Sequence, residues 1–215
     1  MLNDISMLGA ETRRTRAYIN ALRDNDLLPS TLVLMKSVVT GDKFDIEEAA
    51  RAAGVPVIVV EAEDVNSTDV IAAIDQLPQR FVIYSGPAGT IVRRPLFATG
   101  KKFIHVHPGR LPDFRGSTTI YYSLLAEKKI ELSALLLNEE IDGGPVIGRA
   151  EFDPPADRST IDYGFDPTIR ASLLVSVLRE YAEQGRFREQ AQAQGVGESY
   201  YIIHPVLKHI AILAS

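Results

Sequence analysis

The chain contains no cysteine and no tryptophan among its 215 residues. Without cysteine there are no disulfides and no thiolate zinc sites, and this composition fits a reducing compartment. No apolar run approaches the roughly 18 residues that a membrane-spanning helix needs. The first residues, Met1-Leu-Asn-Asp, lack the basic and then apolar layout of a secretory signal. We therefore expect a cytoplasmic protein that has no membrane partner.

Basic residues are fewer than acidic ones: the chain has 23 Lys and Arg residues and 28 Asp and Glu residues, which gives a net charge of −5. An acidic chain does not favour nucleic acid, so we expect no nucleic-acid partner. A hydrophobic share of 46% and a charged share of 24% are typical of a globular domain. Pro154-Pro155 interrupts the pattern late in the chain. We expect a catalytic domain over residues 1–155, with residues 156–215 forming a C-terminal helix and extension packed on it.

Apolar runs and helical spacings alternate through the first half of the chain. The predicted strands cover residues 31–35, 57–60, 81–84 and 103–107, with a weaker one at 2–8. The predicted helices cover residues 12–27, 45–53 and 67–77. Continuously apolar strands are buried on both faces, so this order predicts an α/β fold: a Rossmann-like, mostly parallel sheet with helices on both faces. Ligands of such sheets bind at the carboxyl ends of the strands.

The second half of the chain continues with fewer strands. We predict a helix at 118–127, strands at 132–137 and 146–152, and a helix that begins at Pro167. A polar segment at 183–197 predicts an exposed loop. The apolar stretch Tyr200–Leu213 follows it. This stretch either docks on the core or pairs two copies as a homodimer, and the pattern leaves both open.

Two histidines mark the end of the strand at 103–107. Side chains alternate along an extended segment, so His105 and His107 point the same way before Pro108 and Gly109 end the run. Loops held by a rigid scaffold carry a large share of catalytic groups. Two histidines also suit a metal ion, but no third ligand is spaced convincingly, and we expect none to bind. A second signal is a carboxylate before two glycines, Asp142-Gly143-Gly144.

Together these segments resemble the folate-dependent formyltransferase family. That family includes glycinamide ribonucleotide transformylase, methionyl-tRNA formyltransferase and the sugar N-formyltransferases. Its pattern is Asn-x-His-Pro, Leu-Pro, aromatic-Arg-Gly and Asp-x-Gly. This chain matches it at His107-Pro108, Leu111-Pro112, Phe114-Arg115-Gly116 and Asp142-Gly143-Gly144, with 142 − 107 = 35 positions between the histidine and the aspartate. In this chain His105 stands where the family has asparagine.

The resemblance implies transfer of a formyl group from 10-formyltetrahydrofolate to an amine. His107 would then donate to the developing oxyanion and move a proton, while Asp142 orients the imidazole and raises its pKa. The family's asparagine donates at every pH, whereas a neutral imidazole at position 105 offers one N–H in one tautomer. Two hypotheses follow. Either His105 serves as the donor with a shifted substrate, or the protein is a weakened or inactive homologue that binds folate or a nucleotide sugar.

The resemblance also implies the binding residues. The folate donor is expected at Ser85, Gly86, Ile91, Val92, Asn138, Glu139, Glu140, Ile141 and Gly143. The acceptor is expected at Gly9, Arg115, Ser117, Thr118, Thr119 and Tyr122. Two alternatives stay open: Arg115 pins its own loop, and the three hydroxyl residues cap the helix that follows.

Three kinds of molecule can be compared as the acceptor that carries the amine. A ribonucleotide phosphate is disfavoured, because Gly9 is a lone glycine followed by the carboxylate of Glu11. A tRNA is disfavoured by the acidic charge. Hydroxyls and the aromatic faces of Tyr121 and Tyr122 suit a sugar or a base. By elimination we expect a nucleotide-linked amino sugar, and with it a role in sugar biosynthesis.

Overall fold

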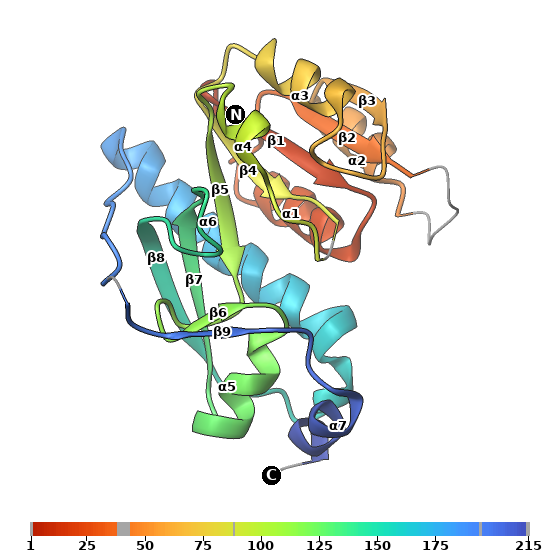
Figure 1. Ribbon diagram of the computed structural model, residues 1–215. Coiled ribbons are helices and arrows are strands. Elements are labelled where there is room, and N and C mark those ends of the chain that lie inside the picture. The colour runs from red at the N-terminus through yellow and green to blue at the C-terminus, as the bar shows by residue number, and fades with distance from the viewer. Residues whose placement is uncertain (1, 38–43, 88, 194, 214–215) are drawn as a thin grey trace. The chain divides into compact units, whose positions relative to one another are not determined.

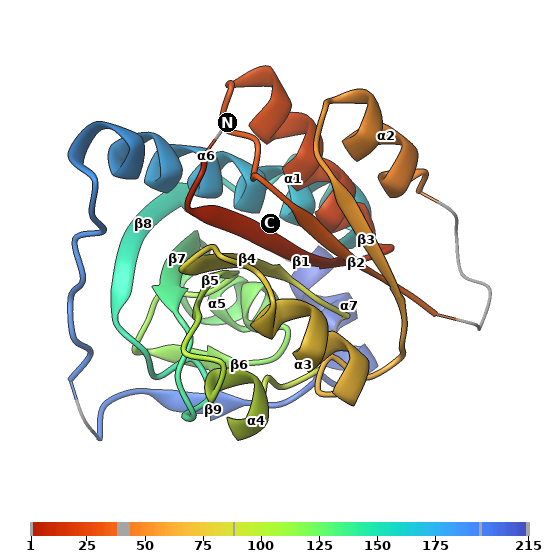
Figure 2. The same cartoon turned by 90° about the horizontal axis from the view of Figure 1, so that it is seen from above.

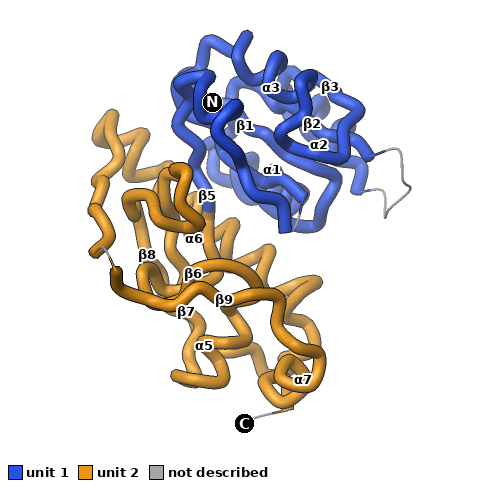
Figure 3. The backbone as a smooth tube through the Cα atoms, in the orientation of Figure 1, with its two compact units in different colours: residues 1–105 blue, residues 106–215 orange. Residues whose placement is uncertain are grey.

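A computed structural model describes residues 2–37, 44–87, 89–193 and 195–213. The chain folds into two compact units, unit 1 (residues 1–105) and unit 2 (residues 106–215), as Figure 3 shows. The division falls inside strand β5 (Lys102–His107). The boundary predicted after residue 155 lies within unit 2.

Unit 1 holds parallel strands in the order β3-β2-β1-β4-β5. The first four strands are β1 (Ile5–Ala10), β2 (Leu32–Lys36), β3 (Val57–Glu61) and β4 (Phe81–Ser85). Helices α1 (Arg13–Asp24) and α2 (Ile46–Ala52) lie on one face, and α3 (Thr68–Asp75) lies on the other with α4 (Arg94–Phe97) beside it (Figures 1 and 2). The expected α/β class with mostly parallel strands and helices on both faces is confirmed.

Local signals explain where the helices of unit 1 begin and end. The hydroxyl of Thr12 accepts a hydrogen bond from the backbone N–H of Thr15 and starts α1. Ser67 caps α3 in the same way. Gly54 follows α2 with φ +80°, a conformation that favours glycine because it has no Cβ. Helices α1 and α3 therefore start where short polar side chains replace missing backbone partners, and α2 ends at a glycine.

The prediction that residues 57–60 form a buried strand is half wrong. The strand is present as β3, but Ile58 is 41% exposed and Val59 is 39% exposed. The physical reason is that β3 stands at the end of the strand order, beside β2. An apolar run read from sequence does not distinguish a strand in the middle of a sheet from one at its edge.

Unit 2 contains an antiparallel pair of strands covered by a long helix. Strand β7 (Ile130–Leu136) pairs with β8 (Val146–Phe152), and α6 (Asp166–Gln184) packs against both (Figure 1). A 3₁₀ turn (Arg158–Thr160) and a π-helical turn (Ile161–Phe165) lead into α6. Gly148 lies under α6, where a Cβ would approach Val177 to 2.5 Å. Glycine here lets the helix approach the strand closely.

In the rest of unit 2, the residues that follow β5 pack against the C-terminal segment. Strand β6 (Phe114–Gly116) pairs in parallel with β9 (Glu198–Tyr200), and neither was predicted. Helix α5 (Thr119–Glu127) follows β6 and contacts α7 (Pro205–Leu213). Helix α7 buries Ala211 and leaves Val206, Ile210 and Leu213 exposed, so it docks within unit 2 through only part of its surface. Among the described helices, none has both the length and the apolar character that crossing a bilayer requires.

The pairing of β6 with β9 depends on Gly116. This residue has φ +95°, and a Cβ on it would lie 2.2 Å from the carbonyl oxygen of Tyr200. We expect Gly116→Ala to lower the free energy of unfolding by about 2–4 kcal/mol, because strain and a backbone clash add. Urea denaturation followed by circular dichroism measures it. The control is Gly164→Ala, where a Cβ meets nothing within 4 Å; equal effects of the two changes contradict the prediction.

Candidate active site

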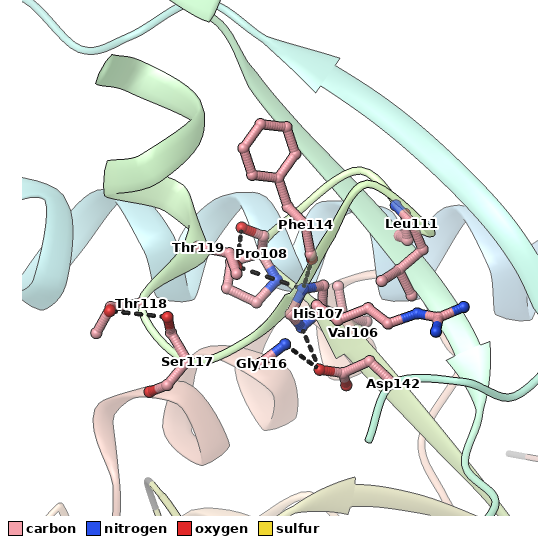
Figure 4. Close-up of polar contacts among 12 residues, drawn as sticks. Val106, His107, Pro108, Leu111, Phe114, Gly116, Ser117, Thr118, Thr119 and Asp142 are labelled. Atoms are coloured by element: carbon pink, nitrogen blue, oxygen red, sulfur yellow. Dashed lines mark hydrogen bonds and ion pairs between the residues drawn. The ribbon is translucent and has the colours of Figure 1, made fainter. Parts of the chain in front are cut away.

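His107 and Asp142 lie side by side in unit 2 (Figure 4). His107 ends β5, and Asp142 lies in the loop between β7 and β8. The His107 Nδ1 atom is 3.4 Å from Asp142 Oδ2. The histidine is 1% exposed and the aspartate 9% exposed. The expected meeting of an imidazole and a carboxylate from distant parts of the chain is therefore present, in a site almost closed to water.

The other ring nitrogen of His107 faces a backbone carbonyl. Its Nε2 atom lies 2.6 Å from the carbonyl oxygen of Phe114 and 3.3 Å from Thr119 Oγ1 (Figure 4). The Thr119 hydroxyl donates to the carbonyl oxygen of Pro108 at 2.8 Å. Since a carbonyl can only accept, a proton on Nε2 donates to Phe114. This leaves Nδ1, beside Asp142, as the position where the protonation of His107 can change.

Burial controls the charge of His107. Desolvation lowers the pKa of its imidazole below 6.5, and this outweighs the raising effects of Asp142 and the Phe114 carbonyl. From helix α6, Arg170 lowers the pKa further and Asp166 raises it. We expected Asp142 to raise the pKa of His107. The carboxylate acts in that direction, but the net shift is downward, so His107 is neutral at neutral pH.

The carboxylate of Asp142 is oriented by the backbone of β6. The N–H of Gly116 donates to Asp142 Oδ2 at 2.8 Å, the same oxygen that faces His107. The loop before it is a turn in which Asn138 Oδ1 accepts from the N–H of Glu140 at 3.0 Å. After it, Gly144 approaches the carbonyl oxygen of Leu136 so closely that a Cβ would lie 1.8 Å away. Glycine at position 144 is thus a steric requirement of this loop.

His105 lies two residues before His107 on β5. Its ring is tilted at 54° to the ring of Tyr84, with centroids 5.8 Å apart. Potential ligand atoms of His105, His107 and Asp142 all lie within 4.8 Å of one another. We expected no metal because no third ligand was spaced convincingly in the sequence. That reason is wrong, because Asp142 provides a third ligand atom. Two imidazoles and a carboxylate are a donor set that transition metals accept. The expected lack of a metal stays a prediction.

In unit 1, the segment that we expect to bind folate is held by two residues that the sequence patterns did not single out. Arg14 donates to Ser85 Oγ at 3.2 Å and also to the carbonyl oxygen of Gly86. Asn66 donates to the carbonyl oxygen of Ile91 at 3.0 Å. Ser85 and Val92 are buried, whereas Ile91 is 55% exposed. Of these expected folate residues, Ile91 is the side chain most open to a ligand.

In unit 2, the segment that we expect to bind folate is more exposed. Asn138, with its turn described above, lies in the same loop as Gly143, whose N–H donates to the carbonyl oxygen of Glu140 at 3.2 Å. Glu139 and Glu140 are exposed, and Ile141 is 50% exposed. The loop therefore presents an apolar side chain beside a compact turn.

The expected acceptor residues of unit 2 are tied to the C-terminal segment. Arg115 Nη2 donates to Gln192 Oε1 at 3.0 Å, which supports the alternative that Arg115 pins its loop. Thr118 Oγ1 accepts from the N–H of Ile203 at 2.9 Å. Thr118 stands at the N-cap of α5 but makes no side-chain capping bond to the described helix. Thr119 is fully buried.

Three expected acceptor residues remain. The N–H of Ser117 donates to the carbonyl oxygen of Tyr200 at 2.8 Å. The ring of Tyr122 lies 4.5 Å from that of Tyr200. In unit 1, Gly9 packs so closely on Thr15 that a Cβ would lie 2.7 Å from its methyl carbon. Ser117 and Tyr122 are thus bound to β9, while Gly9 allows the first helix to approach β1.

Comparison with known proteins identifies relatives. Residues 5–161 match the formyl transferase family. The methionyl-tRNA formyltransferase of Chloroflexus aurantiacus is 30% identical over 142 residues, which cover 64% of this chain and 44% of that protein. The corresponding enzyme of Bacillus subtilis is 30% identical over 110 residues, 50% of this chain and 34% of that one. The chain thus spans less than half the length of these curated relatives.

Solved structures share the fold. A sugar N-formyltransferase from a Shewanella species superposes with a TM-score of 0.62 at 17% identity, covering 97% of this chain and 86% of that one. The phosphoribosylglycinamide formyltransferase of Bacillus halodurans gives 0.63 at 18% identity, covering 85% and 96%. At such identities the likeness shows a common fold.

The lowered pKa of His107 predicts a specific pH dependence of stability. Below pH 6.5 the unfolded chain takes up a proton that folded His107 does not, so stability falls as the pH falls toward the folded pKa. One such proton contributes at most about 1.4 kcal/mol per pH unit. We expect His107→Gln to flatten the dependence between pH 7.5 and 5.5, as measured by urea titrations. His209→Gln, at an exposed position, is the control; the same flattening in both variants would show that His107 is not the cause.

Proposed function

The chain belongs to the formyl transferase family, and from this premise we propose that it transfers a formyl group from a formylated reduced folate to the amine of a small molecule. The buried pair of His107 and Asp142 carries the proposal. Formylation of an amine removes a proton from the attacking nitrogen and returns one to the leaving nitrogen. A neutral imidazole beside a carboxylate, shielded from water, is suited to hold that proton in between.

When bound, a formylated folate supplies the formyl carbon. The contribution of this chain is to hold a proton and to place donors near the oxygen that becomes negative. The Nε2 proton of His107 is committed to the Phe114 carbonyl, so we assign proton uptake to Nδ1. Asp142 then stabilises the positive charge on the ring, and Gly116 keeps its carboxylate in place. Because the pKa of His107 is lowered, the ring readily gives up the proton it has taken.

The residues present fit a flat, partly apolar donor. Ile91 in unit 1 and Ile141 in unit 2 are each about half exposed, although isoleucine is usually buried. Each lies in a segment whose backbone is held by hydrogen bonds, from Asn66 in one case and within the Asn138 turn in the other. Ligand pockets combine apolar walls with a few fixed polar groups. We propose each of these side chains by itself as a folate contact of its own unit.

A nucleotide-linked amino sugar is the proposed acceptor. The supporting observations are the net charge of −5 and the resemblance in fold to sugar N-formyltransferases. One such neighbour, from Helicobacter canadensis, was solved with folinic acid and dTDP-3-aminofucose, at a TM-score of 0.61 and 12% identity. The curated relatives are named for methionyl-tRNA, so a tRNA acceptor is the alternative that a substrate panel has to test.

The proposal predicts that activity depends on the buried pair. We expect His107→Asn and Asp142→Asn each to lower kcat by roughly 10²–10⁴, the range typical of positioned proton-transfer groups. Formylation of a panel of nucleotide-linked amino sugars and of methionyl-tRNA, with 10-formyltetrahydrofolate as donor, provides the measurement. Asp157→Asn, an exposed carboxylate in unit 2, is the control. Full activity in both site variants, or formylation of none of these amines by the parent, overturns the proposal.

His105 distinguishes an adapted enzyme from an inactive homologue. We propose that the His105 imidazole supplies the N–H that an asparagine supplies elsewhere in the family. We then expect His105→Asn to lower kcat by roughly 10²–10³, because the shorter amide no longer reaches the developing charge. A large gain in kcat in the same assay supports the second candidate, a weakened homologue that binds folate or a nucleotide sugar.

A further inference from the structure

Gln192 contacts the loop that carries Asp142. It lies in the segment between α6 and β9, 192 − 161 = 31 residues beyond the end of the family match. Its Nε2 atom donates to the carbonyl oxygens of Asp142 at 2.6 Å and Gly144 at 2.7 Å. Its Oε1 atom accepts from Arg115 Nη2 at 3.0 Å. The Gln192 side-chain amide therefore makes hydrogen bonds through both its nitrogen and its oxygen. The nitrogen binds the Asp142 loop, and the oxygen binds Arg115 of β6.

The backbone of Asp142 needs such support. Its φ is +49°, in the left-handed region that residues with a side chain rarely adopt. Conformations of this kind persist when the surrounding structure determines them from several sides, and they concentrate at functional sites. By bridging the carbonyls on either side of Gly143, the Gln192 amide holds the peptide units that set the direction of the Asp142 side chain.

We propose that Gln192 is a positioning residue that fixes the carboxylate of Asp142 beside His107. Neighbouring residues of β6 complete the arrangement. Gly116 holds the Asp142 side chain through its N–H, and Arg115 anchors the amide that holds the Asp142 backbone. Strand β6 is itself paired with β9. The C-terminal segment thus becomes part of the site, and its catalytic consequence rests on the proposed role of Asp142.

Two substitutions separate positioning from simple anchoring of Arg115. Gln192→Leu removes both the donor and the acceptor at nearly constant size. Gln192→Glu keeps an acceptor for Arg115 but replaces the donor by a carboxylate, which cannot donate to the two carbonyl oxygens. The matched control is Gln190→Leu. Gln190 is exposed, lies two residues away, and likewise accepts from an arginine, Arg149, at 2.9 Å.

The first readout does not depend on catalysis. The ¹⁵N chemical shifts of the His107 ring at pH 7.5 report its tautomer and the charge near Nδ1. Besides Asp142, the Phe114 carbonyl and, from α6, Arg170 and Asp166 act on this ring, and His105 lies close to it; the substitutions leave all of these groups in place. We expect the His107 resonances to move in both Gln192 variants and to match those of the parent in Gln190→Leu.

The second readout is the division between kcat and KM. We expect both Gln192 variants to lower kcat by roughly tenfold to hundredfold, with KM for the amine changed by less than about twofold, because a misplaced proton-transfer group slows chemistry more than binding. Unchanged ring shifts and unchanged kcat in folded Gln192 variants overturn the inference. If only Gln192→Leu has an effect, the residue anchors Arg115 and does not position Asp142. Moved ring shifts in a protein that formylates no amine preserve this inference and remove the proposed function instead.

Discussion

The contact between His107 and Asp142, made where water is excluded, is the interaction on which the candidate site depends. Burial by itself makes an imidazole neutral, and a carboxylate beside it favours the charged form. In this protein the effect of burial on the pKa of His107 outweighs that of the carboxylate. Asp142 nevertheless lies close enough to stabilise a proton on the imidazole. The balance requires the two groups to be held at fixed positions. Two residues of unit 2 with positive φ, Gly116 and Asp142, hold the pair together.

The supports of the pair come from all along unit 2. Phe114 and Thr119 face one edge of the imidazole, and Gly116 binds the carboxylate. From α6, Arg170 Nη1 donates to the carbonyl oxygen of Val106 at 2.8 Å, immediately before His107. Gln192 reaches the Asp142 loop from the other side. Under the proposed function these distant contacts would matter for rate, because a fixed orientation of catalytic groups is worth several orders of magnitude.

His105, His107 and Asp142 form the cluster of polar side chains at this site. An amide offers an N–H donor whose state does not depend on pH, whereas a neutral imidazole offers one N–H in one tautomer. The same cluster has the donor atoms of a metal site. Family membership therefore does not by itself determine what this site does, and the chemistry has to be argued from its three side chains.

The order of elements and the identity of the central pair could be predicted from the sequence. Apolar runs, caps such as Ser67 and the glycine at position 54 are local signals, and they placed most strands and helices within a few residues. His107 and Asp142 could be found because motif residues surround each of them. The exposure of β3 could not be predicted, because an apolar run is the same in the middle of a sheet and at its edge.

Tertiary structure decided how the pair is held and what charge it carries. Burial reversed the expected direction of the His107 pKa shift, since desolvation depends on everything packed around the ring. Gln192 lies in a polar segment that the sequence predicts to be an exposed loop. The backbone pairing of Gln190 with Val146, together with the pairing of β6 with β9, brings that segment to the Asp142 loop. Local sequence fixes which groups are available, because propensity and pattern act over a few residues. Their distances and protonation states arise from contacts between residues far apart in the chain, which no local pattern encodes.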